Sequence, residues 1–336
     1  MRIILPVYII DYINTLFQVV VKILFSKQEI GGYKVSGANK VTKVTIVKSK
    51  DRYEAMRRSI ELLEINPVKD KKVILKPNFN TADPYPGSTH PETLRGLVEI
   101  LYKMGAAGIT IVERSGPVDS GQVMKELGVF ELAEKYQLEV INIDEMPPED
   151  MVKVTPPDSH WKDGFLVPKL FQEAECIVAV PNLKTHQYGG AFTMALKLAV
   201  GIVPKTINNY MRELHGSPHM QKMIAEINYG YKPDLIVMDA MEAFVEAGPM
   251  TGKKKRSDLF LAGTDRIAID AVGLAILKDL GSTPDIMNKK IFDQEQIARA
   301  VELGLGVANP DNIELLTGDA DSAEYARTIR SILKEG

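Results

Sequence analysis

Proton-transferring and anion-binding side chains are concentrated in residues 178–201, VAVPNLKTHQYGGAFTMALKLAVG. An apolar run ends there at Pro181, and Lys184 and His186 follow within five residues. A histidine titrates near neutral pH, and a lysine that is shielded from water can act as a base or a nucleophile. Side chains of these types, crowded behind an apolar run, predict a site that binds an anion and moves protons.

A second lysine of this stretch, Lys197, lies in a pattern that predicts a helix over residues 191–200. Thr193 and Lys197 are four residues apart, so they would share one face of that helix, on the side of His186. The rest of the helix is apolar, which favours a buried functional lysine over one whose amine reaches solvent. We therefore take His186 and Lys197 as candidate catalytic residues, and Lys184 and Thr193 as candidate ligands of the anion.

Polar residues also follow the strand predicted over residues 71–77. Lys76 and Asn78 occur at its end and are candidate anion ligands. Further on, Pro91 begins a predicted helix, which makes His90 its N-cap. Because a helix N-terminus attracts anions, His90 is a third candidate catalytic residue, and a solvated capping residue is the alternative.

Two further groups carry charge or metal-binding capacity. Glu113 and Arg114 follow the strand predicted over residues 108–113, where a charged pair fits either a functional site or a surface loop. His215 is a candidate metal ligand or general base. His219 lies four residues later, but a glycine and a proline intervene, so the two histidines do not form a metal-binding pair on one helix.

The elements that must position these side chains alternate along the chain from residue 41. Short β-rich runs are separated by longer helical patterns, which is typical of an α/β fold with mostly parallel sheets and helices on both faces. In such folds, ligands bind beyond the carboxyl ends of the strands. The predicted strands cover residues 43–48, 71–77, 108–113, 138–143, 176–181, 234–239 and 258–263, and the other predicted helices cover 51–64, 91–105, 120–127, 265–279, 294–303 and 322–334.

The 336 residues are enough for one large or two modest domains. We predict two lobes, residues 41–145 and 146–320, with the Lys/His cluster in the second lobe and a cleft between the two. A C-terminal helix would occupy residues 321–336. Segment 144–170 is rich in proline and aspartate and interrupts the alternation, so it is either an inserted hairpin or a crossing between the lobes.

The N-terminal segment, residues 1–40, has its own pattern. Residues 3–25 are apolar except for five side chains that recur at helical spacing, which predicts an amphipathic helix followed by a linker. The polar stripe through its middle argues against a membrane-spanning helix. Its apolar face would either dock on the body or on a second copy, giving a homo-oligomer, or lie in a membrane interface.

Composition limits the function classes. A formal net charge of −3 gives no basic field for nucleic acid. The single cysteine, Cys176, excludes an intrachain disulfide and an iron–sulfur cluster bound by this chain alone. One cysteine favours a reducing compartment, so we expect a cytoplasmic protein, either free or peripherally associated with a membrane.

Several separated motifs resemble the domain-of-unknown-function family 362. They are KPNFN from residue 76, THPETLRGLVEIL from 89, PNLKTH from 181 with the Gly-Gly, Thr and Lys positions after it, ELH from 213, EAGPMTG from 246 and LAGTDRIAIDAVG from 261. Their order matches the family from about residue 43 to residue 320. Many members of that family carry ferredoxin-type cysteine clusters, and this chain has none.

A more distant likeness is to lactate racemase. The positions that follow the order of its motifs are His90-Pro91, Gly108-Ile109-Thr110, His186, Gly189-Gly190, Lys197 and His215. The resemblance implies an acid/base role for His186, a covalent or anion-binding role for Lys197, and a metal-ligand role for His215 in a nickel-type cofactor. Lys76-Pro77-Asn78 stands where the racemase has an Asp-His-Thr-Arg stretch, so the likeness does not extend to substrate anchoring.

These patterns predict an enzyme that acts on a small carboxylate or phosphate by isomerase, racemase or redox chemistry. The anion ligands would be Lys76, Asn78, Lys184 and Thr193, the proton-moving residues His186, Lys197 and His90, and the ligand of a metal ion His215. The alternative is a non-enzymatic cofactor- or metal-binding protein that its N-terminal helix tethers to a partner or a membrane.

Overall fold

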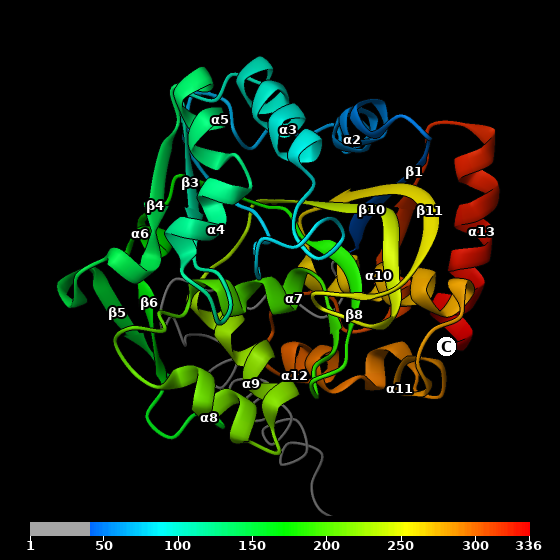
Figure 1. Ribbon diagram of the computed structural model, residues 1–336. Coiled ribbons are helices and arrows are strands. Elements are labelled where there is room, and N and C mark those ends of the chain that lie inside the picture. Colours follow the sequence, from blue (N-terminus) through cyan, green and yellow to red (C-terminus); the bar gives the residue numbers. More distant parts are fainter. Residues whose placement is uncertain (1–40) are drawn as a thin grey trace, which may run out of the picture. The chain divides into compact units, whose positions relative to one another are not determined.

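A ten-stranded sheet and a separate two-stranded sheet form the framework of residues 41–336, the part of the chain that the computed structural model describes (Figure 1). The strands are β1 (Thr42–Lys48), β2 (Lys72–Lys76), β3 (Gly108–Glu113), β4 (Glu139–Asn142), β5 (Met151–Val154), β6 (Phe165–Pro168), β7 (Cys176–Ala179), β8 (Asn182–His186), β9 (Ala191–Thr193), β10 (Leu235–Ala247), β11 (Gly252–Gly263) and β12 (Ile313–Leu316). The larger sheet has the order β12-β1-β11-β10-β7-β2-β3-β4, and β8 pairs with both β10 and β9. Its pairings are parallel except β1–β11, β10–β11 and β8–β9, which confirms the predicted α/β class with a mostly parallel sheet.

Helices cover both faces of this sheet, as predicted. They are α2 (Arg52–Glu61), α3 (Pro91–Lys103), α4 (Ser120–Glu126), α5 (Val129–Tyr136), α6 (Leu170–Glu173), α7 (Ala195–Leu198), α8 (Tyr210–Gly216), α9 (Met220–Ile227), α10 (Arg266–Leu280), α11 (Pro284–Met287), α12 (Glu295–Glu302) and α13 (Ala320–Glu335). Side chains alternate along β2: Val73 and Leu75 join the apolar cluster of α2 and α3, whereas Ile74 joins the cluster of α8 and α9. The polar residues that follow β2 are therefore held between two packed layers.

Strands from both predicted lobes belong to the larger sheet. β1 lies between β11 and β12, and β2 lies beside β7. The described residues pack as one compact unit. The lobe boundary at residue 145 stays a prediction, and the ends of the strands position the site described below.

The helix predicted over residues 191–200 is wrong at its start. Its first residues form β9, which pairs antiparallel with β8, and α7 begins only after them. The backbone N–H groups of Ala195 and Leu196 donate to the carboxylate of Asp270 at 2.7 and 2.9 Å, so a distant side chain fixes the start of the helix. Thr193 therefore lies on a strand and not on the helix that carries the lysine.

Two other predicted segments have different outcomes. In segment 144–170, β5 and β6 pair antiparallel, so the inserted hairpin is confirmed. The amphipathic helix and linker predicted over residues 1–40 lie outside the described residues. Within residues 41–336, no helix is long and apolar enough to cross a membrane.

Candidate functional site

The carboxyl ends of β2 and β3 meet the β8–β9 hairpin and α7 around a pocket of about 50 Å³, which we name the lysine pocket. A water molecule needs roughly 10–15 Å³ of such space, so the pocket has room for about four water-sized groups, as in one carboxylate or phosphate. Five of the predicted site residues line it together: Lys76, Asn78, Lys184, Thr193 and Lys197. Their chemical roles stay predictions, but the structure places them in one pocket.

One ion pair forms part of the wall of the lysine pocket. The Nζ atom of Lys76 donates to Glu113 Oε1 at 2.7 Å, and both side chains are about 1% exposed. Burial lowers the pKa of Lys76 and raises that of Glu113, and the attraction between the two opposes both shifts. At Gly201, a Cβ atom would lie 2.9 Å from each of the paired atoms, so any larger residue would strike the pair. The charge of Lys76 is therefore already matched within the protein.

Lys184 is fully buried, and no carboxylate forms an ion pair with it in the described part of the chain. Its Nζ atom donates to the carbonyl oxygens of Gly87 and Pro249, which fix its position. Burial lowers the pKa of Lys184 to about 7, and the nearby charge of Lys197 acts in the same direction. The carboxylates of Asp83 and Glu113 oppose this shift from beyond ion-pair distance, so the ammonium is held in place without a carboxylate in direct contact.

The side chain of Lys197 makes no hydrogen bond or ion pair with any other residue in 41–336. Burial lowers its pKa to about 8, and the charge of Arg114 lowers it further. With Arg114, the lysine pocket is lined by four cationic side chains and one carboxylate, a net charge of +3 when all are ionised. The lining of the pocket therefore carries an excess of positive charge.

Two uncharged polar atoms of the lysine pocket also lack partners. Asn78 Oδ1 and Thr193 Oγ1 are buried, and neither has a hydrogen-bond partner among the described residues. Buried polar atoms are rarely left unpaired in folded proteins, because their lost hydration costs about 1–3 kcal/mol. The pocket thus fits a ligand that carries negative charge together with hydrogen-bonding groups such as a hydroxyl.

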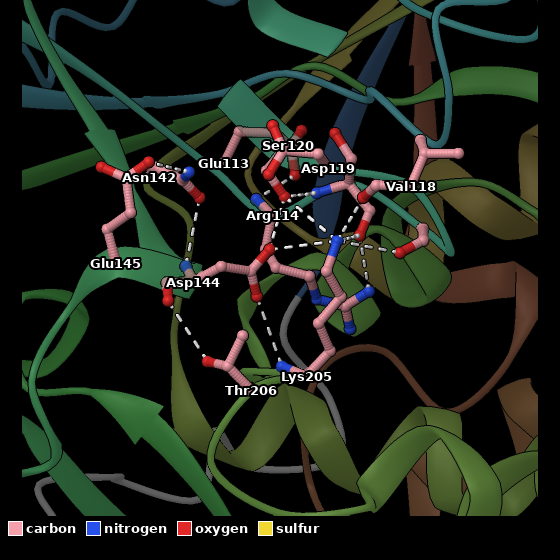
Figure 2. Close-up of polar contacts among 12 residues, drawn as sticks. Glu113, Arg114, Val118, Asp119, Ser120, Asn142, Asp144, Glu145, Lys205 and Thr206 are labelled. Atoms are coloured by element: carbon pink, nitrogen blue, oxygen red, sulfur yellow. Dashed lines mark hydrogen bonds and ion pairs between the residues drawn. The ribbon is translucent and has the colours of Figure 1, made fainter. Parts of the chain in front are cut away.

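Arg114 fastens the loop after α7 to the end of β3. Its guanidinium donates to the carbonyl oxygens of Val200 at 2.6 Å and Val203 at 2.8 Å, and burial lowers its pKa. Figure 2 shows the neighbouring ammonium of Lys205 surrounded by oxygen atoms. These oxygens belong to the carbonyls of Ser115, Gly116 and Val118, the hydroxyl of Ser120 and the carboxylate of Asp144.

Loss of the Lys205 ammonium is expected to loosen this wall of the pocket. Lys205→Met would leave the largely buried Asp144 carboxylate and the loop carbonyls without their shared donor. We expect the free energy of unfolding, measured in urea, to fall by about 1–3 kcal/mol. Lys125→Met, at an exposed lysine of nearby α4, is the control and should change it by less than about 0.5 kcal/mol. Equal losses in the two variants would contradict this role of Lys205.

His186 is 6% exposed and lines a different, larger pocket of about 600 Å³. Its Nδ1 atom accepts a hydrogen bond from the backbone N–H of Gly190 at 3.2 Å, which places the ring proton on Nε2. Burial lowers the pKa of His186 to about 2, and the charge of Lys197 adds to the shift. The imidazole is therefore neutral at physiological pH and can donate a hydrogen bond through Nε2.

The other two predicted histidines lie away from the lysine pocket lining. His90 caps α3, as predicted, by accepting from the backbone N–H of Glu92 at 3.1 Å, and it lines a separate pocket of about 450 Å³ beside Arg52. His215 lies on α8 and is only partly covered by its neighbours. This partial burial lowers its pKa, and the charges of Lys197 and Arg114 lower it further. The catalytic role of His90 and the metal role of His215 stay predictions.

The donor set around His215 does not fit a metal ion. Within residues 41–336, no three or more His, Cys, Asp or Glu side chains are grouped so that they could hold one. The charged side chains that act on His215 are the cations Lys197 and Arg114, which would repel a metal ion. We derive no step through a metal or a nickel-type cofactor.

Three features of the lysine pocket were not predicted from the sequence. Glu113 and Arg114 were noted only as a charged pair with two interpretations, although their place after a buried strand was the available signal. The position of Gly201 over the Lys76–Glu113 pair was not predicted either. The carbonyl of Gly87 gave no signal, because its contact with Lys184 joins residues 97 positions apart.

Comparison with known proteins supports one family assignment. The family model described as "Domain of unknown function (DUF362)" matches residues 73–275, a range that includes every residue lining the lysine pocket. No curated protein matches the chain.

Proposed function

This chain belongs to the DUF362 family, and we propose that it is an enzyme that binds a small carboxylate or phosphate in the lysine pocket and moves a proton at a carbon next to a carboxylate of its substrate. One observation carries the proposal. Lys184 and Lys197, both with lowered pKa values, line a pocket that has room for one small anion, and no carboxylate of the described residues forms an ion pair with either of them.

The binding half of the proposal follows from charge. An ammonium that is buried without a partner destabilises a fold, because its lost hydration is not replaced. A bound carboxylate or phosphate would replace the lost hydration of both ammonium groups. Binding would therefore explain why the chain has two such lysines in this pocket. Lys184, fixed by two carbonyl oxygens, supplies a positioned positive charge. The unpaired Asn78 and Thr193 atoms would then orient hydrogen-bonding groups of the same ligand.

The catalytic half rests on Lys197. Because the pKa of Lys197 is about 8, this side chain is a neutral amine in about a tenth of the protein molecules at pH 7. A neutral amine held near the substrate can take a proton from a carbon next to a carboxylate, and the ammonium so formed can return it. The charge of Lys184 would stabilise the enolate that forms between the two transfers. Return by Lys197 to the same carbon exchanges its hydrogen, and return to a neighbouring carbon on the same face gives isomerase chemistry. Racemase chemistry needs a second group that donates a proton to the opposite face.

Anion affinity is expected to fall as the pH rises. Sulfate is a suitable probe because it stays a dianion between pH 6 and pH 9. Its binding favours the charged forms of Lys184 and Lys197, and those forms are lost as the pH passes about 7 and about 8. Calorimetry should show the Kd for sulfate rising about twentyfold between pH 6 and pH 8 and more steeply above that. A Kd that stays constant over this range would contradict anion binding by these lysines.

The catalytic step can be tested by hydrogen exchange at carbon. Lactate, malate, glycerate and gluconate would be incubated with the protein in deuterium oxide, and proton NMR would follow loss of the signal next to the carboxylate. We expect exchange in at least one of them at pH 8 and none in protein-free samples. If sulfate binds but none of the four exchanges, an anion-binding protein becomes the better interpretation of the site.

A further inference from the structure

The pocket of about 600 Å³ that His186 lines is large enough for the main part of a small-molecule ligand. We name it the amide pocket, because four side-chain amides line it: Gln187, Gln221, Asn288 and Gln294. Its charged groups are few. Lys289 and Glu295 pair with each other at 3.9 Å, which leaves the carboxylate of Asp285.

The amide pocket and the lysine pocket lie along the same face of the β8–β9 hairpin. Lys184 is paired with Thr193 across the hairpin, and both line the lysine pocket. Two residues further along, His186 is paired with Ala191, and both line the amide pocket. Residues two apart in a strand point to the same side, and directly paired residues do so as well. The two pockets are therefore neighbours, with their hairpin residues about 7 Å apart along the strand.

A single glycine separates the groups that face the two pockets. A Cβ atom on Gly190 would lie 2.7 Å from Nδ1 of His186 and 3.2 Å from Cε of Lys197. The imidazole lines the amide pocket and the lysine side chain lines the lysine pocket, and both come close to the position that a Cβ atom of Gly190 would take. Any side chain at Gly190 would therefore displace one or both of them.

The lining of the amide pocket offers hydrogen bonds rather than positive charge. An amide group both donates and accepts, and it matches hydroxyl or amide groups of a ligand. Gln221 Oε1 is buried and has no hydrogen-bond partner among the described residues. The neutral imidazole of His186, which lines this pocket, adds the Nε2–H donor. An apolar ligand would leave these groups unpaired, and a second anion would meet Asp285.

We propose that the substrate has two parts: a compact anionic head in the lysine pocket and a polar, uncharged body with hydroxyl or amide groups in the amide pocket. The reacting carbon then lies near Gly190, where the side chains of Lys197 and His186 come close to the same point. This inference rests on the proposed function and adds the substrate class. The polar body distinguishes this substrate from bare small anions, which have no body, and from fatty acids, whose body is apolar.

Three carboxylates test the inference directly. Acetate is a bare head, gluconate adds a polyhydroxylated body, and hexanoate adds an apolar body with the same number of carbons. We expect calorimetry to give gluconate a Kd at least about tenfold lower than acetate, and hexanoate no such gain. Inorganic phosphate and glucose 6-phosphate form the corresponding pair for a phosphate head.

One variant with a matched control tests whether the higher affinity for gluconate comes from the amide pocket. Asn288 lines the amide pocket and is exposed, so Asn288→Trp narrows the pocket without disturbing the core. We expect the ratio of the acetate Kd to the gluconate Kd to fall to about one in Asn288→Trp. Met287→Trp, at the exposed neighbouring residue that does not line the pocket, should keep the wild-type ratio.

The outcomes separate this inference from the function on which it rests. If acetate or phosphate binds but the polyhydroxylated ligand gains nothing, or hexanoate gains as much, the two-part substrate is wrong and anion binding stands. An unchanged ratio in Asn288→Trp would likewise place the body outside the amide pocket. If none of the five ligands binds, the proposed function fails first and the inference falls with it.

Discussion

Lys197→Met is expected to abolish hydrogen exchange next to the carboxylate while making the protein more stable. Loss of a general base should slow exchange by about 10²–10⁴-fold. Stability should move in the opposite direction, because methionine has a similar length and carries no charge that burial penalises. At pH 7, below both the folded pKa of about 8 and the usual pKa of 10.5, the fold bears the full cost of holding this ammonium. The free energy of unfolding should therefore rise by about 1–3 kcal/mol in the variant.

The opposite signs make this a sharp test of function. A residue kept only for packing would lose stability when replaced, and a residue kept for chemistry loses activity instead. Exchange would be followed by NMR and unfolding by urea titration, with Lys125→Met as the exposed control. Wild-type exchange in Lys197→Met would remove Lys197 from the mechanism, and a large loss of stability would assign it a structural role.

Glu113→Gln is expected to be the most destabilising single change in the pocket. It leaves the Lys76 ammonium about 1% exposed and without its carboxylate. Breaking a buried ion pair from one side costs about 3–5 kcal/mol. The glutamate also accepts from the backbone N–H of Phe79 at 3.1 Å, so part of the loss is a weakened turn after β2. Urea denaturation measures the change.

The double variant Lys76→Met/Glu113→Gln separates these contributions. Removing both charges should restore most of the lost stability, because no unpaired ion remains. A loss below about 1 kcal/mol in Glu113→Gln alone would mean that the pair is held in its neutral form. A double variant as unstable as Glu113→Gln would show that packing of the glutamate, and not the ion pair, supports the pocket.

Local patterns predicted the side chains that follow strands. Lys76 and Asn78 come at the end of an apolar run, and the carboxyl ends of parallel strands meet at one edge of a sheet. That rule accounts for these two residues of the lysine pocket, whereas the β8–β9 pairing and α7 bring Lys184, Thr193 and Lys197 to it. The rule could not rank the lysines, because Lys76 forms an ion pair with Glu113 and Lys184 forms none among the described residues. Pairing partners 37 positions apart are set by the sheet order, which periodicity does not contain.

Long-range contacts also explain the predictions that were wrong or incomplete. The sequence AFTMALKLAV fits a buried helix or a buried strand equally well. Pairing with β8 and the carboxylate of Asp270 decide between them at Ala195. His186 and Lys197 were expected on one surface, whereas the register of the hairpin puts the histidine one step further along, in the amide pocket. His90 caps its helix as expected, but a different pocket surrounds it.

The most direct test is titration of the lysine ammonium groups by NMR in protein labelled with carbon-13 at lysine Cε. Two resonances should titrate with pKa values of about 7 and about 8, and Lys197→Met should remove the second. Saturating sulfate should raise both values, because a bound anion stabilises the charged forms. If every lysine titrates near 10.5 and sulfate moves none of them, the lysine pocket neither binds an anion nor supplies a base.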